Sequence, residues 1–205
     1  MAHVIRFHST GSPEVLRYET LELPAPAAGE ARLRQSAVGV NFIDVYHRNG
    51  LYPVSLPSGL GSEGAGIVEA VGPGVSAIAP GDRVVYCGGP LGGYASERNV
   101  PASLLVKLPD AISEQHVAAG FLRAMTVEYL LTRTYACKAG DTILFHAAAG
   151  GVGLIAAQWC RAIGVTMIGT VGSDEKAELA RQHGCAHVIN YRHEDFVARV
   201  KEITD

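Results

Sequence analysis

A stretch of small residues carries the most evident chemistry in this sequence. Residues 142–153 read Thr-Ile-Leu-Phe-His-Ala-Ala-Ala-Gly-Gly-Val-Gly, so a short apolar run gives way to three alanines and three glycines. A helical pattern follows at residues 154–163. A strand, a tight small-residue turn and a helix form the opening unit of a dinucleotide-binding fold, in which the helix N-terminus faces a diphosphate. The stretch therefore predicts a nucleotide site.

The match to the usual fingerprint Gly-x-Gly-x-x-Gly is incomplete, because Ala148 stands where its first glycine would be. The alternative is a glycine-rich helix start made only for tight packing. A strand before the turn and further βα units after it favour the cofactor site. We expect Gly150 to let the backbone approach the diphosphate and Gly153 to let the helix pack on the strand. The predicted diphosphate-binding residues are Ala148, Ala149, Gly150, Gly151, Val152 and Gly153.

The end of the next predicted strand, residues 165–171, indicates which nicotinamide cofactor binds. NAD-specific folds place an acid about 20 residues after the glycines, where it binds the ribose 2′-hydroxyl. Here Gly172 and Ser173 follow the strand, and no acid lies at its tip. Lys176 lies in the first turn of the following helix, where a cation is unfavourable unless an anion accompanies it. The alternative is a solvated lysine balanced by the acids beside it.

The rest of the chain predicts an α/β protein of two domains, residues 1–122 and 123–205. Gly/Pro turns separate many short strands in the first domain, which is typical of a small, closed, antiparallel β unit. Its expected strands are residues 4–7, 15–23, 31–40, 64–71, 83–87, 94–100 and 104–108, with a short helix after Asn41. In the second domain, strands at 143–146, 165–171 and 186–190 alternate with helices at 154–163, 174–183 and 194–203, which predicts a parallel sheet. A helical pattern at 114–135, interrupted near Gly120, joins the two.

Composition narrows the function classes. A net charge of −3 over 205 residues argues against a nucleic-acid surface, and no apolar run is long enough to span a membrane. The four cysteines show no pairing pattern, which is typical of reduced thiols in a cytoplasmic protein. A doubly wound dinucleotide fold has about six strands, whereas the sequence predicts three, so we expect the chain to lack the C-terminal part of that fold.

Several motifs occur in the order found in one known family. In addition to residues 140–153, they are Asn41-Phe42-Ile43-Asp44, Gly50-Leu51-Tyr52-Pro53, Gly61-x-Glu63-x-Ala65-Gly66 and Gly81-Asp82-Arg83-Val84. Together they resemble the zinc-independent, ζ-crystallin-like quinone oxidoreductases of the medium-chain dehydrogenase/reductase superfamily, and most closely the bacterial NADPH:quinone reductases. The resemblance implies a GroES-like β-rich catalytic domain beside a Rossmann domain with a doubly wound parallel sheet. It also implies a homodimer.

The resemblance implies NADPH as cofactor. It assigns the 2′-phosphate to Ser173, Lys176 and Tyr191, and it places Thr126 against the nicotinamide. Gly172 is also expected to bind the cofactor. It implies no metal, because Asn41 and Ser62 replace a cysteine and a histidine that bind zinc in zinc-dependent relatives. His146, just before the glycine turn, is predicted to be a core histidine at the end of a strand.

Four residues are the candidates for the reaction itself: Asn41, Asp44, Tyr46 and Tyr52. Asn41 and the tyrosines can hydrogen-bond a quinone oxygen or the nicotinamide ribose, although an N-capping Asn and buried tyrosines are the ordinary alternative. Glu63 is expected to be either a buried acid that orients the site or a structural carboxylate. The expected activity is NADPH-dependent reduction of a small quinone. The alternatives are reduction of enones or other activated alkenes, and a non-catalytic, crystallin-like NADPH-binding protein.

Overall fold

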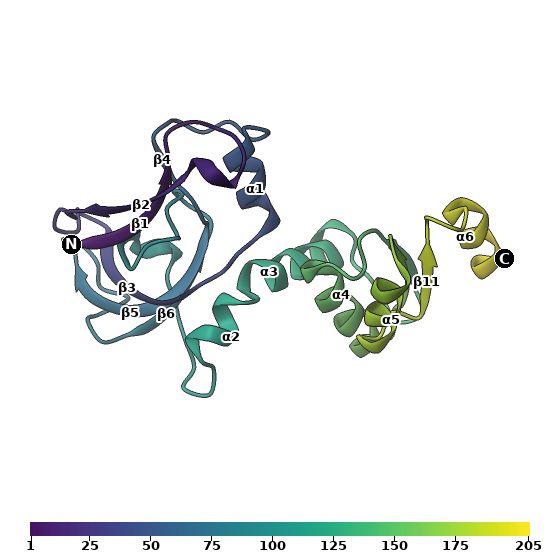
Figure 1. The fold of residues 1–205 in the computed structure, drawn as a ribbon. Coiled ribbons are helices and arrows are strands. Elements are labelled where there is room, and N and C mark those ends of the chain that lie inside the picture. Colours follow the sequence, from purple (N-terminus) through teal and green to yellow (C-terminus); the bar gives the residue numbers. More distant parts are fainter. The chain divides into compact units, whose positions relative to one another are not determined.

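Short antiparallel strands build the first part of the chain in the computed structural model, which describes residues 1–205 (Figure 1). The chain divides into two units, Met1–Leu122 and Arg123–Asp205, and each is described by itself. In the first unit, five strands pair in the order β7-β3-β5-β6-β8 and three in the order β2-β1-β4. The strands are β1 (Ala2–Phe7), β2 (Leu16–Leu21), β3 (Glu30–Val38), β4 (Ser58–Gly59), β5 (Glu63–Val71), β6 (Arg83–Cys87), β7 (Glu97–Pro101) and β8 (Val106–Lys107).

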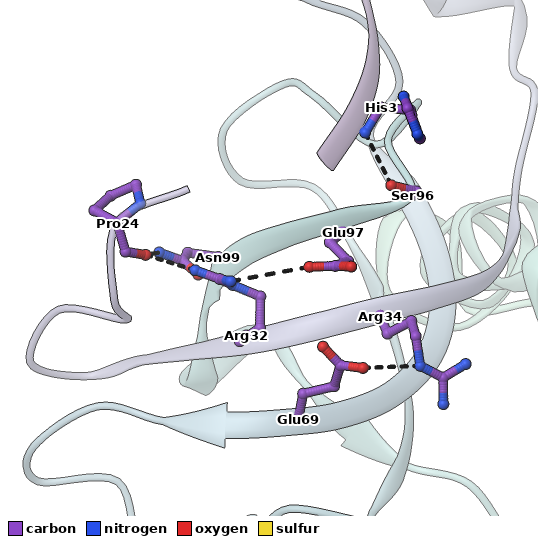
Figure 2. Close-up of polar contacts among 8 residues, drawn as sticks. All are labelled: His3, Pro24, Arg32, Arg34, Glu69, Ser96, Glu97 and Asn99. Carbon is purple, nitrogen blue, oxygen red and sulfur yellow. Dashed lines mark hydrogen bonds and ion pairs between the residues drawn. The ribbon is translucent and has the colours of Figure 1, made fainter. Parts of the chain in front are cut away.

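Alternation along β3 explains which face of the five-stranded sheet is buried. Ala31 and Leu33 are fully buried, whereas the arginines between and after them point outward, as expected for successive strand residues. Figure 2 shows the outer face: Arg34 Nε lies 2.8 Å from Glu69 on β5, and Arg32 Nε donates to Asn99 on β7 at 2.7 Å. The larger apolar cluster therefore lies on one face of the sheet, and polar side chains connect the strands over part of the other. A smaller buried cluster contains Ala65, Val85 and Ala118.

Two predicted strands of this unit were wrong in extent. The strand expected at 94–100 begins only at Glu97, because residues 94–96 hydrogen-bond β1 instead, as in the bond from Ser96 N–H to the His3 carbonyl at 2.8 Å. The strand expected at 104–108 is limited to the two residues of β8, because Leu104 still belongs to the 3-10 helix Ala102–Leu104. Two helices follow strands in this unit: α1 (Phe42–Asn49) and α2 (Glu114–Ala118).

The second unit contains a parallel sheet in the order β11-β10-β9, as the alternation of strands and helices predicted. Its strands are β9 (Thr142–Phe145), β10 (Thr166–Val171) and β11 (His187–Asn190). β10 lies between the other two and is buried almost throughout, which its apolar sequence Thr-Met-Ile-Gly-Thr-Val explains. The helices are α3 (Phe121–Tyr129, which begins in the first unit), the π-helix Leu130–Thr134, α4 (Gly151–Ala162), α5 (Asp174–Gln182) and α6 (Phe196–Thr204).

α4 and α5 pack on β10 and on each other (Figure 1), through small residues such as Ala156, Ala157 and Ala180, all fully buried. Small side chains allow the helices to approach the sheet closely. α4 begins at Gly151, three residues before the helix expected from the sequence, so two of the three glycines lie within its first turn. Every helix of the chain is too short or too polar to cross a bilayer.

Candidate functional site

A cavity of about 610 Å³ lies at the carboxyl ends of β9, β10 and β11. This edge is where open α/β sheets bind ligands, because the loops that follow each strand meet there. Five of the predicted cofactor residues line the cavity: Ala149, Gly150, Gly172, Lys176 and Tyr191. The strand order therefore brings together residues that lie about 40 positions apart in the sequence.

The small-residue turn is shaped by close backbone approaches. Ala147 adopts a left-handed conformation with φ +55°, and the Ala148 N–H donates to the Thr170 carbonyl at 3.0 Å. A Cβ on Gly153 would lie 2.5 Å from the Ala148 carbonyl oxygen, so only glycine allows α4 to pack this closely on the turn. The packing role expected of Gly153 follows directly from this distance.

The N-terminus of α4 has no side-chain cap. Its N-cap residue is Gly150, and no side chain accepts a hydrogen bond from the first turn, which contains Gly151, Val152 and Gly153. Unpaired N–H groups at a helix start favour an anion. The guanidinium of Arg123 adds positive charge here, since its Nε lies 2.8 Å from where a Cβ of Gly151 would be. Arg123 was not predicted, because nothing in the sequence connects it with the turn.

The tip of β10 has a defined geometry. The Ser173 hydroxyl accepts a hydrogen bond from the Lys176 N–H at 3.3 Å and so caps α5. The Tyr191 hydroxyl lies only 2.5 Å from where a Cβ of Gly172 would be, so the phenol rests against the glycine. Gly172, Lys176 and Tyr191 thus border one part of the cavity, while Ser173 shapes the helix start beside it.

The Lys176 ammonium is exposed and forms no ion pair with Asp174 or Glu175. This is compatible with a phosphate partner and with the alternative of a solvated lysine. The two acids that line the cavity have other partners. Glu194 accepts from the Asn190 N–H at 2.9 Å and from Arg199 Nε at 3.1 Å. Asp195 caps α6 by accepting from the Val197 N–H at 2.9 Å.

The prediction of a core histidine at position 146 was wrong. β9 ends at Phe145, so His146 lies one residue beyond the strand, where it is exposed and lines the cavity. Its Nδ1 lies 2.9 Å from the Thr170 hydroxyl, and its ring meets Phe196 edge-on with 5.5 Å between ring centroids. Thr170 and Phe196 were also missed, because their place in the cavity depends on strand pairing and on the start of α6.

In the first unit, Asn41 and Asp44 form a buried polar group at the start of α1. Asn41 caps the helix, and its N–H donates to Asp44 Oδ2 at 2.9 Å. The same oxygen accepts from the Tyr94 hydroxyl at 2.6 Å. Burial, and then this bond to Asp44, raise the pKa of Tyr94 above its ordinary value near 10. Asp44 Oδ1 is buried without a hydrogen-bond partner, which leaves an acceptor available at this point.

Glu63 accounts for the orientation of Asn41. Its Oε2 accepts from Asn41 Nδ2 at 2.7 Å, and its Oε1 accepts from the Leu122 N–H at 2.6 Å, at the start of α3. The carboxylate is 1 % exposed and both of its oxygens are engaged. It therefore ties the start of α1 to the start of α3, which agrees with both readings of Glu63, as an orienting and as a structural acid.

The two candidate tyrosines lie in an aromatic cluster. Tyr46 on α1 lies 5.3 Å from Tyr52 and 5.2 Å from Phe42, measured between ring centroids. Tyr52 is 45 % exposed and Phe42 70 %, so the alternative of ordinary buried tyrosines does not fit Tyr52. Exposed rings of this kind can stack on a flat aromatic molecule.

Metal ligands are lacking where zinc-dependent relatives have them. The Asn41 amide nitrogen faces the Glu63 carboxylate as a donor, and Ser62 offers a hydroxyl in place of an imidazole. No group of three or more His, Cys, Asp or Glu side chains is arranged to hold a metal ion. Thr126 lies half-buried on α3 and does not line the cavity at the sheet edge.

Comparison with known proteins gives two matching family models. The alcohol dehydrogenase GroES-like domain matches residues 27–110, and the zinc-binding dehydrogenase family matches residues 151–205. A quinone oxidoreductase of Pseudomonas aeruginosa is 54% identical over the whole chain, and a 2-haloacrylate reductase of Burkholderia is 46% identical. The chain spans 63% and 62% of the lengths of these two relatives.

The fold has the same relatives. The crystal structure of Escherichia coli quinone oxidoreductase complexed with NADPH matches with a TM-score of 0.97 and 53% identity. The match covers 98% of this chain and 62% of that one. The expected pair of GroES-like and Rossmann folds is confirmed by these matches.

Proposed function

The chain belongs to the quinone oxidoreductase family of the medium-chain dehydrogenase/reductases, and on this premise we propose that the whole protein reduces quinones with NADPH. The observation that carries the proposal is the cavity at the sheet edge. The uncapped start of α4 borders it, as do the unpaired Lys176 and Gly172, against which the Tyr191 phenol rests. Each of these features suits a phosphate-bearing dinucleotide.

The residues of the second unit fit NADPH in two parts. The first turn of α4 would hold the diphosphate, with Ala148 and Ala149 before it and the Arg123 guanidinium beside it. Lys176 and Tyr191 would hold the 2′-phosphate, with Gly172 giving room for the phenol. Thr126 is proposed to contact the nicotinamide, as the family resemblance implies. When bound, the nicotinamide supplies the hydride.

In the first unit, we propose that the substrate meets Asn41, Asp44, Tyr46 and Tyr52. The aromatic cluster offers stacking surface for a quinone ring, and the tyrosine hydroxyls can donate hydrogen bonds to its oxygens. The Asn41 side chain is held by Glu63, so its position is fixed before a substrate arrives. No zinc is proposed; metal analysis of the purified protein tests this, and a stoichiometric metal would contradict it.

Lys176→Ala tests the cofactor assignment. Loss of a charge-assisted bond to a phosphate costs about 1.5–3 kcal/mol, so the dissociation constant for NADPH should rise about tenfold or more. Binding of NADH, which lacks that phosphate, should change less than about twofold. Titrations that follow nucleotide fluorescence measure both constants. Lys201→Ala, on exposed α6, is the matched control, and equal losses for the two cofactors in Lys176→Ala would refute the assignment.

A second candidate function is reduction of activated alkenes, which the 46% identity to a 2-haloacrylate reductase supports. The same hydride source would serve, and the difference would lie in the substrate pocket. NADPH oxidation with 1,4-benzoquinone, with an enone and without an acceptor separates the two. Tight NADPH binding without turnover of either acceptor would favour the non-catalytic, crystallin-like reading.

We further propose that the full-length protein is a cytoplasmic homodimer. Support comes from the family resemblance and from the four free cysteines, Cys87, Cys137, Cys160 and Cys185, which suit a reducing compartment. Light scattering coupled to size-exclusion chromatography tests the dimer, and cell fractionation tests the location. A monomer at micromolar concentration would contradict the first, and recovery outside the cytoplasm the second.

A further inference from the structure

Asn190, the last residue of β11, is a buried amide whose two ends are both engaged. Its side chain lies beside the cavity and is part of a residue that is only 6 % exposed. Nδ2 donates to Asp174 Oδ1 at 2.7 Å, and Oδ1 accepts from the Arg192 N–H at 3.1 Å. A buried amide with partners at both ends has one favoured orientation, so it can hold a carboxylate in a fixed place.

Asp174 is the acid nearest to the tip of β10. It lies in the first turn of α5, next to Ser173 and two residues before Lys176. In dinucleotide folds, an acid after this strand accepts from a ribose 2′-hydroxyl and repels a 2′-phosphate. A freely rotating Asp174 carboxylate would therefore oppose the phosphate that Lys176 is proposed to hold.

We propose that Asn190 is a positioning residue for cofactor choice, an inference that rests on the proposed NADPH site. By holding the Asp174 carboxylate on β11, it keeps that negative charge away from the Lys176 ammonium. Lys176 is then free to pair with a phosphate instead of with its neighbour. A ribose that carries a 2′-phosphate is favoured over one that carries a hydroxyl.

A second bond of Asn190 supports the same role. Its backbone N–H donates to Glu194 Oε1 at 2.9 Å, and the other oxygen of Glu194 accepts from Arg199. One buried residue thus engages two carboxylates, that of Glu194, which lines the cavity, and that of Asp174. Each of these bonds occupies one acceptor oxygen of the carboxylate. Asp195, the third acid in this region, caps α6 and lies outside this set.

The experiment compares NADPH and NADH binding to the purified full-length protein and to Asn190→Ala. Releasing one carboxylate near the phosphate should raise the dissociation constant for NADPH about fivefold or more, because like charges then oppose each other at short range. The constant for NADH should stay within about twofold or fall, since its 2′-hydroxyl can bind a carboxylate. Nucleotide fluorescence gives both constants without turnover, and thermal unfolding reports whether the variant folds.

Rescue separates this role from a merely structural one. In Asn190→Ala with Asp174→Asn, the released side chain carries no charge, so NADPH affinity should return to within about twofold of the wild type. Asp174→Asn alone should keep the NADPH preference. If Asn190→Ala does not fold, Asn190→Ser, which keeps a buried polar group but is too short to reach Asp174, takes its place in both measurements.

Each outcome decides one statement. Weak NADPH binding by the wild type would refute the proposed function itself. Normal NADPH binding by Asn190→Ala would refute the positioning role and leave the proposed function standing. An equal loss of affinity for NADPH and NADH that Asp174→Asn does not restore would also refute the positioning role. Such a result would show that Asn190 only supports the fold.

Discussion

Replacing Glu63 by glutamine should destabilise the protein strongly, although the two side chains have nearly the same size and shape. The carboxylate is 1 % exposed, and its two oxygens accept from Asn41 Nδ2 at 2.7 Å and from the Leu122 N–H at 2.6 Å. Both partners are donors. A glutamine has only one acceptor oxygen, so its amide nitrogen must face one of the two donors.

The size of the effect follows from these contacts. Leaving one buried donor without a partner costs about 1–3 kcal/mol, and the remaining bond loses its charge assistance. The sum is about 3 kcal/mol. For a protein of this size, 1 kcal/mol shifts Tm by about 2–4 °C, so Glu63→Gln should lower Tm by about 6–12 °C.

Glu69→Gln is the matched control, because it makes the same substitution on the same strand, β5. Glu69 pairs with Arg34 at 2.8 Å on the outer face of the sheet (Figure 2), where their side chains are 38% and 51% exposed. Surface pairs contribute about 0–1 kcal/mol, so Tm should fall by less than about 4 °C. Differential scanning calorimetry measures both variants.

Equal Tm values for Glu63→Gln and Glu69→Gln would refute the reasoning. Burial would then not determine how much a carboxylate contributes to the free energy of unfolding. A second readout addresses Asn41. If Glu63 orients this side chain for the substrate, Glu63→Gln should lower kcat even when the assay is run well below the Tm of the variant. The dissociation constant for NADPH should stay within about twofold.

Two further predictions concern a glycine and a cysteine of the second unit. Gly172→Ala places a Cβ 2.5 Å from the Tyr191 hydroxyl, so the half-exposed ring must swing away; fluorescence titration should show NADPH binding about 2–5-fold weaker with Tm changed by less than about 2 °C, and unchanged binding would contradict a role for Tyr191. Burial raises the pKa of Cys160 from 9 to about 11, so the unfolded thiol ionises first and stability falls as pH rises from 9 to 11. Urea unfolding at pH 9 and pH 11 should show that Cys160→Ala reduces this pH-dependent loss of unfolding free energy by up to about 2 kcal/mol. The same dependence of unfolding free energy on pH in wild type and variant would contradict it.

The sequence predicted the order of elements well because the signals are local. Glycine and proline mark the turns between short strands, and the small-residue run at 147–153 marks where β9 gives way to α4. Boundaries were less accurate. The segment at residues 94–96 has strand-like residues but bonds to β1, and only the tertiary fold decides that partner.

The candidate sites were predictable to the extent that a motif carried them. The turn before α4 and the tip of β10 were identified from residue types at known spacings. The contacts that orient these residues were not, because they join distant positions: Asn190 to Asp174, and Glu63 to Leu122. Neither pair has a local pattern. A structural or buried role was expected for Glu63, but its partners were not, and Asn190 looks like a surface residue in a sequence.

Buried polar residues mark both candidate sites in a way that no motif does. Burying such a group costs free energy unless it is hydrogen-bonded, so a fold selected for stability alone has little reason to gather them. All but one of them lie at the two sites: Asn41, Asp44, Ser62 and Glu63 around the start of α1, and Thr170 and Asn190 at the sheet edge. The exception is Arg98, whose guanidinium binds the Tyr86 hydroxyl and the Pro90 carbonyl within the β-rich unit. The cost of burying these groups is therefore concentrated where side chains must be held in one orientation, which is the condition that selective binding of a substrate and of a 2′-phosphate requires.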